Sequence, residues 1–173
     1  MQVTLDQSAM PPGIDDLYSS HHASVYAAAY RVTGNASDAE DVLHTVFLRL
    51  LKRDSSEQID HPEGYLRRAA VNAALDVVRA RRPESDVVLE RMPSKARSAL
   101  ESLGNDDLRR QLRAALATLP EKAAEVFVLR HFEERGNLEI AKMLGMTQVG
   151  VAVTLHRARK KLQDELRKTG VRP

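Results

Sequence analysis

The stretch from Gly136 to Thr147 constrains the fold more than any other part of this 173-residue chain. A short helix can begin at Asn137, a residue type that caps helices well, and Gly145 suits the tight turn that would end it. Met146 can fill the space beside the turn, and Thr147 can cap a second helix. The apolar positions of both helices recur at helical spacing: Ile140, Ala141, Leu144, Val151, Leu155, Ala158, Leu162 and Leu166. The pattern predicts a helix-turn-helix.

The second of these helices, predicted to run to about Lys168, carries a run of basic side chains. They are His156, Arg157, Arg159, Lys160 and Lys161. A row of cations on an exposed helix suits the phosphate backbone of a nucleic acid. A charge run by itself is usually a solvated surface, but here it accompanies the turn and the cap. We therefore predict that this segment binds DNA.

The formal charge of the chain is only +2, but it is unevenly distributed. Acidic residues outnumber basic ones up to Glu63, whereas basic residues cluster from Arg67 to Arg82 and from Arg157 to Lys168. The basic clusters predict a polyanionic partner. The chain has no Cys, which excludes disulfides and thiolate chemistry and is typical of the reducing cytoplasm, where we expect the protein. No apolar run approaches the length of a membrane span, so we expect no membrane insertion.

In the first half of the chain, the residue pattern predicts helices that follow a loose leader, residues 1–13. The first helix would begin after Asp15 and end at Gly34, because Gly is the preferred residue just beyond a helix. Ser37-x-x-Glu40 is a capping box that would open the second helix. Its apolar stripe is unbroken: Ala39, Val42, Leu43, Val46, Phe47, Leu50 and Leu51.

The third helix is predicted from Tyr65 to about Arg81, between Pro62 and Pro83. Small and apolar residues form one face, which permits close helix packing. The arginines lie elsewhere on the helix: Arg67, Arg68, Arg79, Arg81 and Arg82. Judged from this helix alone, binding to phosphates and simple solvation are equally good explanations of these arginines.

Residues 84–105 lack sustained periodicity and predict a linker, in which Val87-Val88-Leu89 could dock on a partner. Helical stripes resume beyond it on both sides of Pro120, and strand-like alternation is not found. We therefore predict an all-α fold. It would consist of two small helical domains, residues 14–83 and 106–173, joined by a flexible linker, with the helix-turn-helix in the second.

Several segments, taken in order, resemble the extracytoplasmic-function group of sigma factors, the smallest members of the sigma-70 family. In the first half they are Asp38-Ala39-Glu40-Asp41 with Phe47-Leu48, and Gly64-Tyr65-Leu66 with Asn72 and Leu75-Asp76. In the second half they are Leu119-Pro120, Glu125 to Arg130, Glu139-Ile140-Ala141 and Leu155-His156-Arg157-Ala158-Arg159. Their order, with a linker of suitable length between the halves, makes the resemblance specific.

The resemblance implies a protein that binds core RNA polymerase and directs it to promoter DNA. The face toward polymerase would contain Asp38, Glu40, Asp41, His44, Thr45 and Leu48. Capture of an unstacked base of the −10 element and promoter melting would involve Lys52, Arg53, Tyr65, Arg67, Arg68, Asn72 and Arg79. The last helix would read the −35 element through Thr147, Gln148, Val151, Ala152, Thr154, His156, Arg157, Arg159 and Lys160. An anti-sigma protein is a further expected partner.

Two of these residues have alternative roles. Asn72 could hydrogen-bond a neighbouring helix instead of a base, since its amide both donates and accepts. For Tyr65 we expect a role in the core rather than stacking on a base.

Two segments depart from the family pattern. His44-Thr45-Val46 replaces the usual Gln-Glu-Thr, which removes an acid from the polymerase-facing helix. Ala152-Val153-Thr154 replaces a common Lys-Ser-Arg, so a long cation is missing from the −35 helix. Gln148 and Thr154 could still hydrogen-bond base edges, and Val151 or Ala152 could contact a thymine methyl. The −35 preference is therefore expected to be divergent, or the contact weaker and more electrostatic.

The departures allow a second reading, a sigma-like decoy or adaptor that binds an anti-sigma regulator without initiating transcription. The retained arginine clusters favour the promoter factor over the decoy. An enzyme is a third class, but the six His do not fall into a metal-ligand spacing with acids, and no Gly-rich phosphate loop or Ser/His/Asp arrangement is found. We expect no catalytic residue, metal or cofactor.

Overall fold

The structure is a computed structural model that describes residues 13–53, 59–81 and 103–168. Within these ranges the only regular elements are helices, which confirms the predicted all-α class. They are α1 (Ile14–Thr33), α2 (Ala36–Leu51), α3 (Pro62–Ala80), α4 (Leu103–Leu116), α5 (Glu121–His131), α6 (Asn137–Leu144) and α7 (Gln148–Lys168). The leader up to residue 12, most of the expected linker including Val87-Val88-Leu89, and Arg82 lie outside the described residues.

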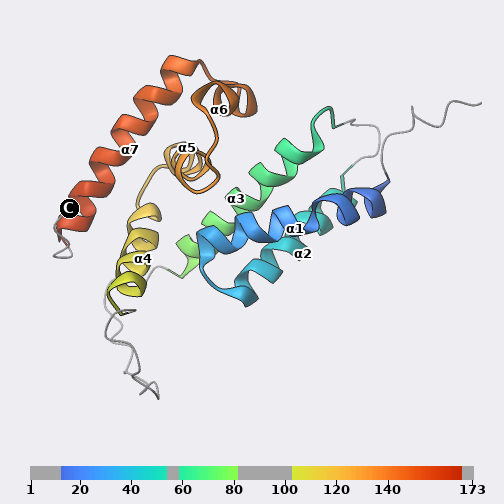
Figure 1. Ribbon diagram of the computed structural model, residues 1–173, viewed down its shortest axis with the longest axis horizontal. Helices are drawn as coiled ribbons and strands as arrows, with labels where there is room; N and C mark the ends of the chain where they lie inside the picture. Colours follow the sequence, from blue (N-terminus) through green and yellow to red (C-terminus); the bar gives the residue numbers. More distant parts are fainter. Residues whose placement is uncertain (1–12, 54–58, 82–102, 169–173) are drawn as a thin grey trace, which may run out of the picture.

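Helices α1, α2 and α3 pack together into a first group, the N-terminal bundle (Figure 1). Its centre is built from small and branched side chains, which are fully or almost fully buried: Val25, Ala28, Ala29, Val32, Val42, Val46, Leu66, Ala70, Ala74 and Leu75. The most extensive contact within the bundle joins α1 to α3, whose small-residue face permits close approach. The other side of α3 is thereby left to face the rest of the chain.

Helices α4 to α7 form the C-terminal bundle, in which α7 packs against α4, α5 and α6. The chain bends by 103° between α6 and α7, an angle typical of helix-turn-helix units. Gly145 makes this bend possible, because it adopts φ 61° in the left-handed region and its N–H donates to Ala141 O. The predicted helix-turn-helix is confirmed.

Some helix boundaries differ from the sequence prediction by one or two residues. The cap of α2 is Asn35, whose side chain accepts a hydrogen bond from the Asp38 N–H at 3.1 Å, and not Ser37. Likewise α6 is capped from Gly136, with Asn137 inside the first turn. The Thr147 hydroxyl caps α7 as predicted, since it accepts from the Gly150 N–H at 3.0 Å.

The two bundles lie side by side, with α3 facing α5 and also touching α4 and α6 (Figure 1). A long linker would allow many arrangements of the bundles, so the sequence did not predict this contact. None of the described helices is by itself long and apolar enough to span a membrane; α6 and α7 pass such a length and composition test only as a pair, across their 103° bend.

Candidate functional site

Helix α7 presents one long exposed side to the surroundings. Its buried side chains are Val151, Leu155, Ala158 and Leu162, which hold it against the rest of the C-terminal bundle. The exposed side begins with Gln148, Val149, Ala152 and Val153 and continues with His156, Arg157, Arg159 and Lys160. The first half of the helix therefore offers mainly apolar atoms, and the second half offers cations.

This arrangement changes the predicted set of base-reading residues. Val151 is fully buried and cannot reach a base, so we remove it from that set. The Thr147 hydroxyl serves as the helix cap, and Thr154 is half-buried. Val149 and Val153, which are 73% and 43% exposed, were not predicted. The signal was present, because Val151 starts the series that continues through Leu155 and Ala158 and therefore belongs to the core.

Arg159 of α7 is hydrogen-bonded to His131 at the end of α5. Its Nη2 lies 3.2 Å from His131 Nε2, and the His131 ring packs against Phe127 with 4.5 Å between ring centroids. Burial lowers the pKa of His131, and the positive charges of Arg159 and Arg130 lower that pKa further. The imidazole is therefore neutral at neutral pH and can accept a hydrogen bond from the guanidinium of Arg159.

Helix α2 exposes part of the predicted polymerase-facing set. Glu40, Asp41 and His44 are exposed, Leu48 is 54% exposed, and Thr45 is half-buried. The neighbouring Leu51, which is 59% exposed, was not in the predicted set and widens the apolar part of this surface. The surface thus combines carboxylates with two large apolar side chains.

Asp38 does not share that surface. It is 5% exposed, and its Oδ2 lies 2.5 Å from Nη1 of Arg81 at the end of α3. The pair joins the start of α2 to the end of α3. Asp38 therefore has a structural role here, because a buried carboxylate requires a partner.

Tyr65 lies at the surface and not in the core. Its side chain is 38% exposed, and the Arg53 guanidinium lies 5.0 Å from the ring centroid, within the range of a cation–π contact. Lys52 is exposed nearby, whereas Arg79 is half-buried and pairs with Asp76 at 3.6 Å. The expected core role for Tyr65 was wrong, because its ring is exposed at the surface and contacts Arg53.

The other α3 side chains of the predicted −10 set contact the C-terminal bundle. Glu125 of α5 is 3% exposed and accepts from Arg68 Nε at 2.6 Å and from Asn72 Nδ2 at 3.1 Å. Glu133 is 7% exposed and accepts from Arg67 Nη1 at 2.8 Å and from Arg31 Nη1 at 2.9 Å. We call these two carboxylates with their partners the interbundle cluster. Asn72 thus hydrogen-bonds a neighbouring helix, one that belongs to the other bundle.

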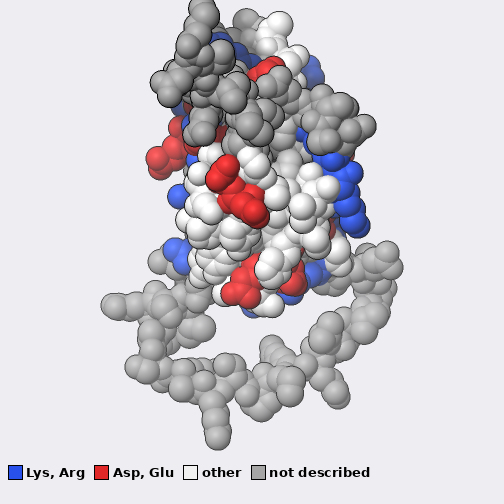
Figure 2. Space-filling model, turned by 90° about the vertical axis from the view of Figure 1, so that its right-hand side faces the viewer, with Lys and Arg blue, Asp and Glu red and all other residues white. Residues whose placement is uncertain are grey.

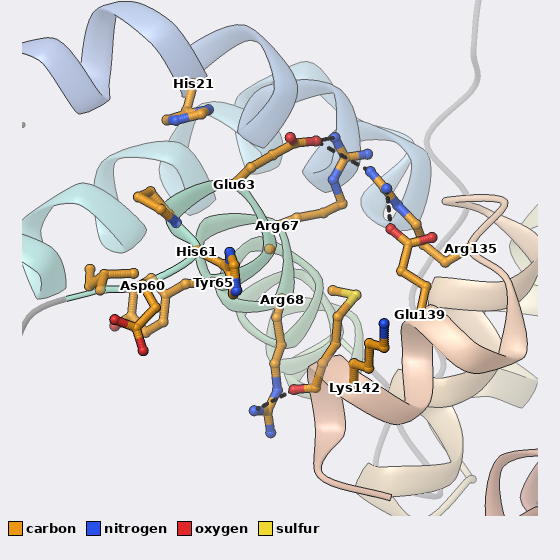
Figure 3. A pocket seen from close by; sticks show the side chains of 14 residues that line it. His21, Asp60, His61, Glu63, Tyr65, Arg67, Arg68, Arg135, Glu139 and Lys142 are labelled. Atoms are coloured by element: carbon orange, nitrogen blue, oxygen red, sulfur yellow. Dashed lines mark hydrogen bonds and ion pairs between the residues drawn. The ribbon is translucent and has the colours of Figure 1, made fainter. Parts of the chain in front are cut away.

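A cavity of about 750 Å³ opens beside this cluster, between α1, the segment 59–61, α3 and α6. Tyr65, His61, Arg67 and Arg68 line it from the N-terminal bundle, and Lys142 lines it from α6 (Figure 3). At one end, Glu63 accepts from Arg67 at 2.9 Å and pairs with Arg135 at 3.4 Å.

Seen from the side where α1 begins, acidic groups stand on a mainly uncharged surface with basic groups toward its edges (Figure 2).

Comparison with known proteins gives two family matches on this chain. Residues 17–84 match sigma-70 region 2, and residues 109–162 match sigma-70, region 4. The chain is 34% identical to the RNA polymerase sigma-E factor of Streptomyces coelicolor over 140 residues, which cover 80% of this chain and 77% of that protein. It is 35% identical to the ECF RNA polymerase sigma factor SigE of Mycolicibacterium smegmatis over 169 residues, 95% of this chain and 65% of that one.

The chain belongs to the extracytoplasmic-function group of the sigma-70 family. The region 2 match covers most of the N-terminal bundle, and the region 4 match covers most of the C-terminal bundle. This sigma factor spans about two thirds, 65%, of the length of the Mycolicibacterium relative.

Two solved structures share the fold of this sigma factor. One is CnrH in complex with the cytosolic domain of CnrY, with a TM-score of 0.55 and 23% identity over 90% of this chain and 88% of that chain. The other is the sigma factor RpoE in complex with the anti-sigma factor NepR from Bartonella quintana, with a TM-score of 0.50 and 16% identity over 87% and 94% of the two chains. At these identities the likeness concerns the fold.

Proposed function

We propose that this chain binds core RNA polymerase and directs promoter-specific initiation through the −10 and −35 elements. The observation that carries the proposal is the presence of both sigma-70 regions on one chain, each of which presents its own exposed surface. We assign residues 14–83 to the polymerase and −10 contacts and residues 106–173 to the −35 contact. We place this activity in the cytoplasm, where polymerase and promoter DNA meet.

The proposed polymerase surface is the exposed side of α2. Glu40, Asp41 and His44 provide polar groups, and Leu48 with Leu51 provides apolar area. Acidic rim charges steer a basic partner into place, while the burial of apolar side chains adds to the binding free energy. The acid that the family usually carries at position 45 is missing, and Leu51 adds apolar area next to Leu48.

The proposed −10 surface consists of Lys52, Arg53, Tyr65 and the basic side of α3. The exposed ring of Tyr65 can stack on an unpaired base, and Arg67 and Arg68 can hold the phosphates of separated strands. In the structure, Arg67, Arg68 and Asn72 already bind Glu125 and Glu133. We therefore propose that the two bundles separate before α3 contacts promoter DNA.

The proposed −35 surface is the exposed side of α7. Recognition helices of helix-turn-helix proteins contact base edges with their N-terminal residues. In α7 these are Gln148, Val149, Ala152 and Val153, and the cations that follow are placed to bind phosphates. We assign phosphate contacts to His156, Arg157, Arg159 and Lys160.

An anti-sigma protein is a further proposed partner. Two proteins of the same fold were solved in complexes, RpoE with the anti-sigma factor NepR and CnrH with the cytosolic domain of CnrY. We propose that a protein of this kind binds here and controls the access of polymerase to α2.

Reconstituted transcription tests the proposed function. The purified chain, sigma-free core polymerase and a pool of genomic fragments are combined, and transcript starts are sequenced. We expect starts that share two spaced upstream motifs, with no such starts from core polymerase alone. Binding to core without starts would contradict the initiation role, and absence of core binding would favour the decoy that binds only a regulator.

A further inference from the structure

Two valines stand exposed at the start of α7, on the side that the proposed function assigns to DNA. Val149 is 73% and Val153 43% exposed, and Ala152 between them is exposed as well. Val is not a favourable choice for an exposed helix position, because β-branched side chains lose rotamer freedom in a helix. Within this part of α7, Gln148 is the one long polar side chain on the exposed side.

The neighbouring charges restrict what can cover these valines. Val149, Val153 and Arg157 are spaced four residues apart, so they form one row along the helix. The row extends about 12 Å, at a rise of about 1.5 Å per residue. It runs from apolar atoms to a cation, and Lys160 is exposed on the next turn. The complementary surface therefore carries apolar groups with negative charge within about 12 Å.

The major groove of DNA supplies that combination. Each thymine places its C5-methyl group in the major groove. The groove is about 12 Å wide, and the phosphates lie along its edges. Val carries no hydrogen-bonding group, so it gains nothing from guanine or adenine acceptors and leaves the amino group of cytosine unpaired. Its gain comes from covering a methyl group.

We propose that Val149 and Val153 select thymines in the −35 element by covering their methyl groups, and that the small Ala152 lets the helix approach the bases. This inference rests on the proposed sigma function. It assigns the −35 preference to two valines, which recognise the bases by shape and apolar contact. A long cation at this part of the helix would instead recognise them by hydrogen bonds.

Replacing thymine by deoxyuracil in the −35 element tests the inference, because base pairing is kept and only the methyl is removed. The probe is a promoter fragment identified by the transcription experiment, bound to polymerase carrying the full chain. We expect the dissociation constant to rise about fourfold for each covered methyl, from about 0.8 kcal/mol per buried carbon. An equal dissociation constant for the thymine and deoxyuracil fragments would overturn the inference.

The variant Val149→Ser with Val153→Ser removes both methyl groups of each valine and leaves a small hydroxyl in their place. We expect this double variant to lose the difference between thymine and deoxyuracil while keeping the salt dependence of binding. Leu108→Ser is the control, because Leu108 on α4 is 42% exposed, close to the 43% of Val153. It should keep the full difference between the two fragments.

The outcomes separate this inference from the proposed function. If no genomic fragment gives transcript starts, the proposed sigma function is wrong, and the inference that rests on it is wrong as well. If starts are found but their shared upstream motif contains no constrained thymine, or if the double variant still distinguishes thymine from deoxyuracil, the function stands and the role of the valines is wrong.

Discussion

Two glycines show how much a single residue can constrain this chain. Gly34 after α1 and Gly145 after α6 both adopt the left-handed conformation, with φ of 66° and 61°. A Cβ on Gly34 would lie 2.0 Å from Nη2 of Arg113, whereas a Cβ on Gly145 would meet open space. Arg113 in turn donates to the Val32 carbonyl at 3.0 Å, so the space at Gly34 is part of the contact between the two bundles.

Gly145→Ala and Gly34→Ala should therefore differ in cost. We expect Gly145→Ala to lower the free energy of unfolding by about 1 to 2 kcal/mol, the cost of the left-handed conformation for an L-residue. Gly34→Ala should cost more, because Arg113 must also move. Urea unfolding of both variants measures the difference, and an equal cost would show that Arg113 adapts freely.

The cations of α7 permit a second prediction at the residue scale. Arg157 is exposed, and Arg159 is hydrogen-bonded to His131. Replacing both with Ala should weaken promoter binding and reduce the slope of log affinity against log salt by about 0.9 for each lost phosphate contact. A salt titration of binding provides the measurement. Lys168→Ala, at the far end of α7 and paired with Glu165, is the control. An unchanged slope would contradict the phosphate contacts.

At the scale of the element, α2 divides its residues between two tasks. One side builds the core of the N-terminal bundle, and the other exposes Glu40, Asp41 and Leu48. The apolar spacing predicted the buried side except for Leu51, the last residue of the stripe, which is 59% exposed. Asp38 shows the limit of that reasoning, because its pairing with Arg81 depends on where α3 ends.

Asp41→Lys should reduce the capture of core polymerase without unfolding the protein. We expect a loss of about tenfold, because the reversal removes one favourable charge pair of up to about 1 kcal/mol and adds an unfavourable one. Pull-down titration with core polymerase measures it, and circular dichroism reports the fold. Asp16→Lys, which changes another exposed acid, on α1, controls for net charge. If both variants capture polymerase equally well, α2 is not the polymerase surface.

At the scale of the whole molecule, the interbundle cluster holds a closed arrangement. Glu125 and Glu133 are buried carboxylates, and they bind side chains of α3 that we assign to promoter DNA. Leaving a buried carboxylate without its partners costs free energy. The closed arrangement is therefore stable only while the arginines of the interbundle cluster stay paired with Glu125 and Glu133. Promoter phosphates would offer those cations an alternative partner.

Glu125→Gln combined with Glu133→Gln should favour the open arrangement, because the amides keep acceptor oxygens but lose the charge. We expect tighter binding of single-stranded −10 DNA and a greater distance between labels on the two bundles. The chain has no Cys, so Ser19→Cys and Gln163→Cys allow specific labelling for energy transfer. Glu139→Gln, at the exposed pair with Arg135, is the control, since such pairs contribute little. Unchanged distance and binding would contradict the closed arrangement.

Local sequence patterns were sufficient to predict the helices, the helix-turn-helix and the family. These follow from local periodicity, from Gly145 and Thr147 at the turn, and from motifs read in order. The cap of α2 did not follow from the sequence, because Asn35 and Ser37 are both capable of capping it and the path of the backbone selects Asn35.

Which side chains remain available to partners depends on how the helices pack. Leu50 and Leu51 both belong to the predicted apolar stripe of α2, yet packing buries the first and exposes the second. Tyr65 is at the surface, with the Arg53 guanidinium over its ring. Glu125 and Glu133 were not predicted as partners of α3, because these contacts join residues 53 to 66 positions apart. Helical spacing acts over a few residues, whereas ion pairs between bundles depend on how the whole chain packs.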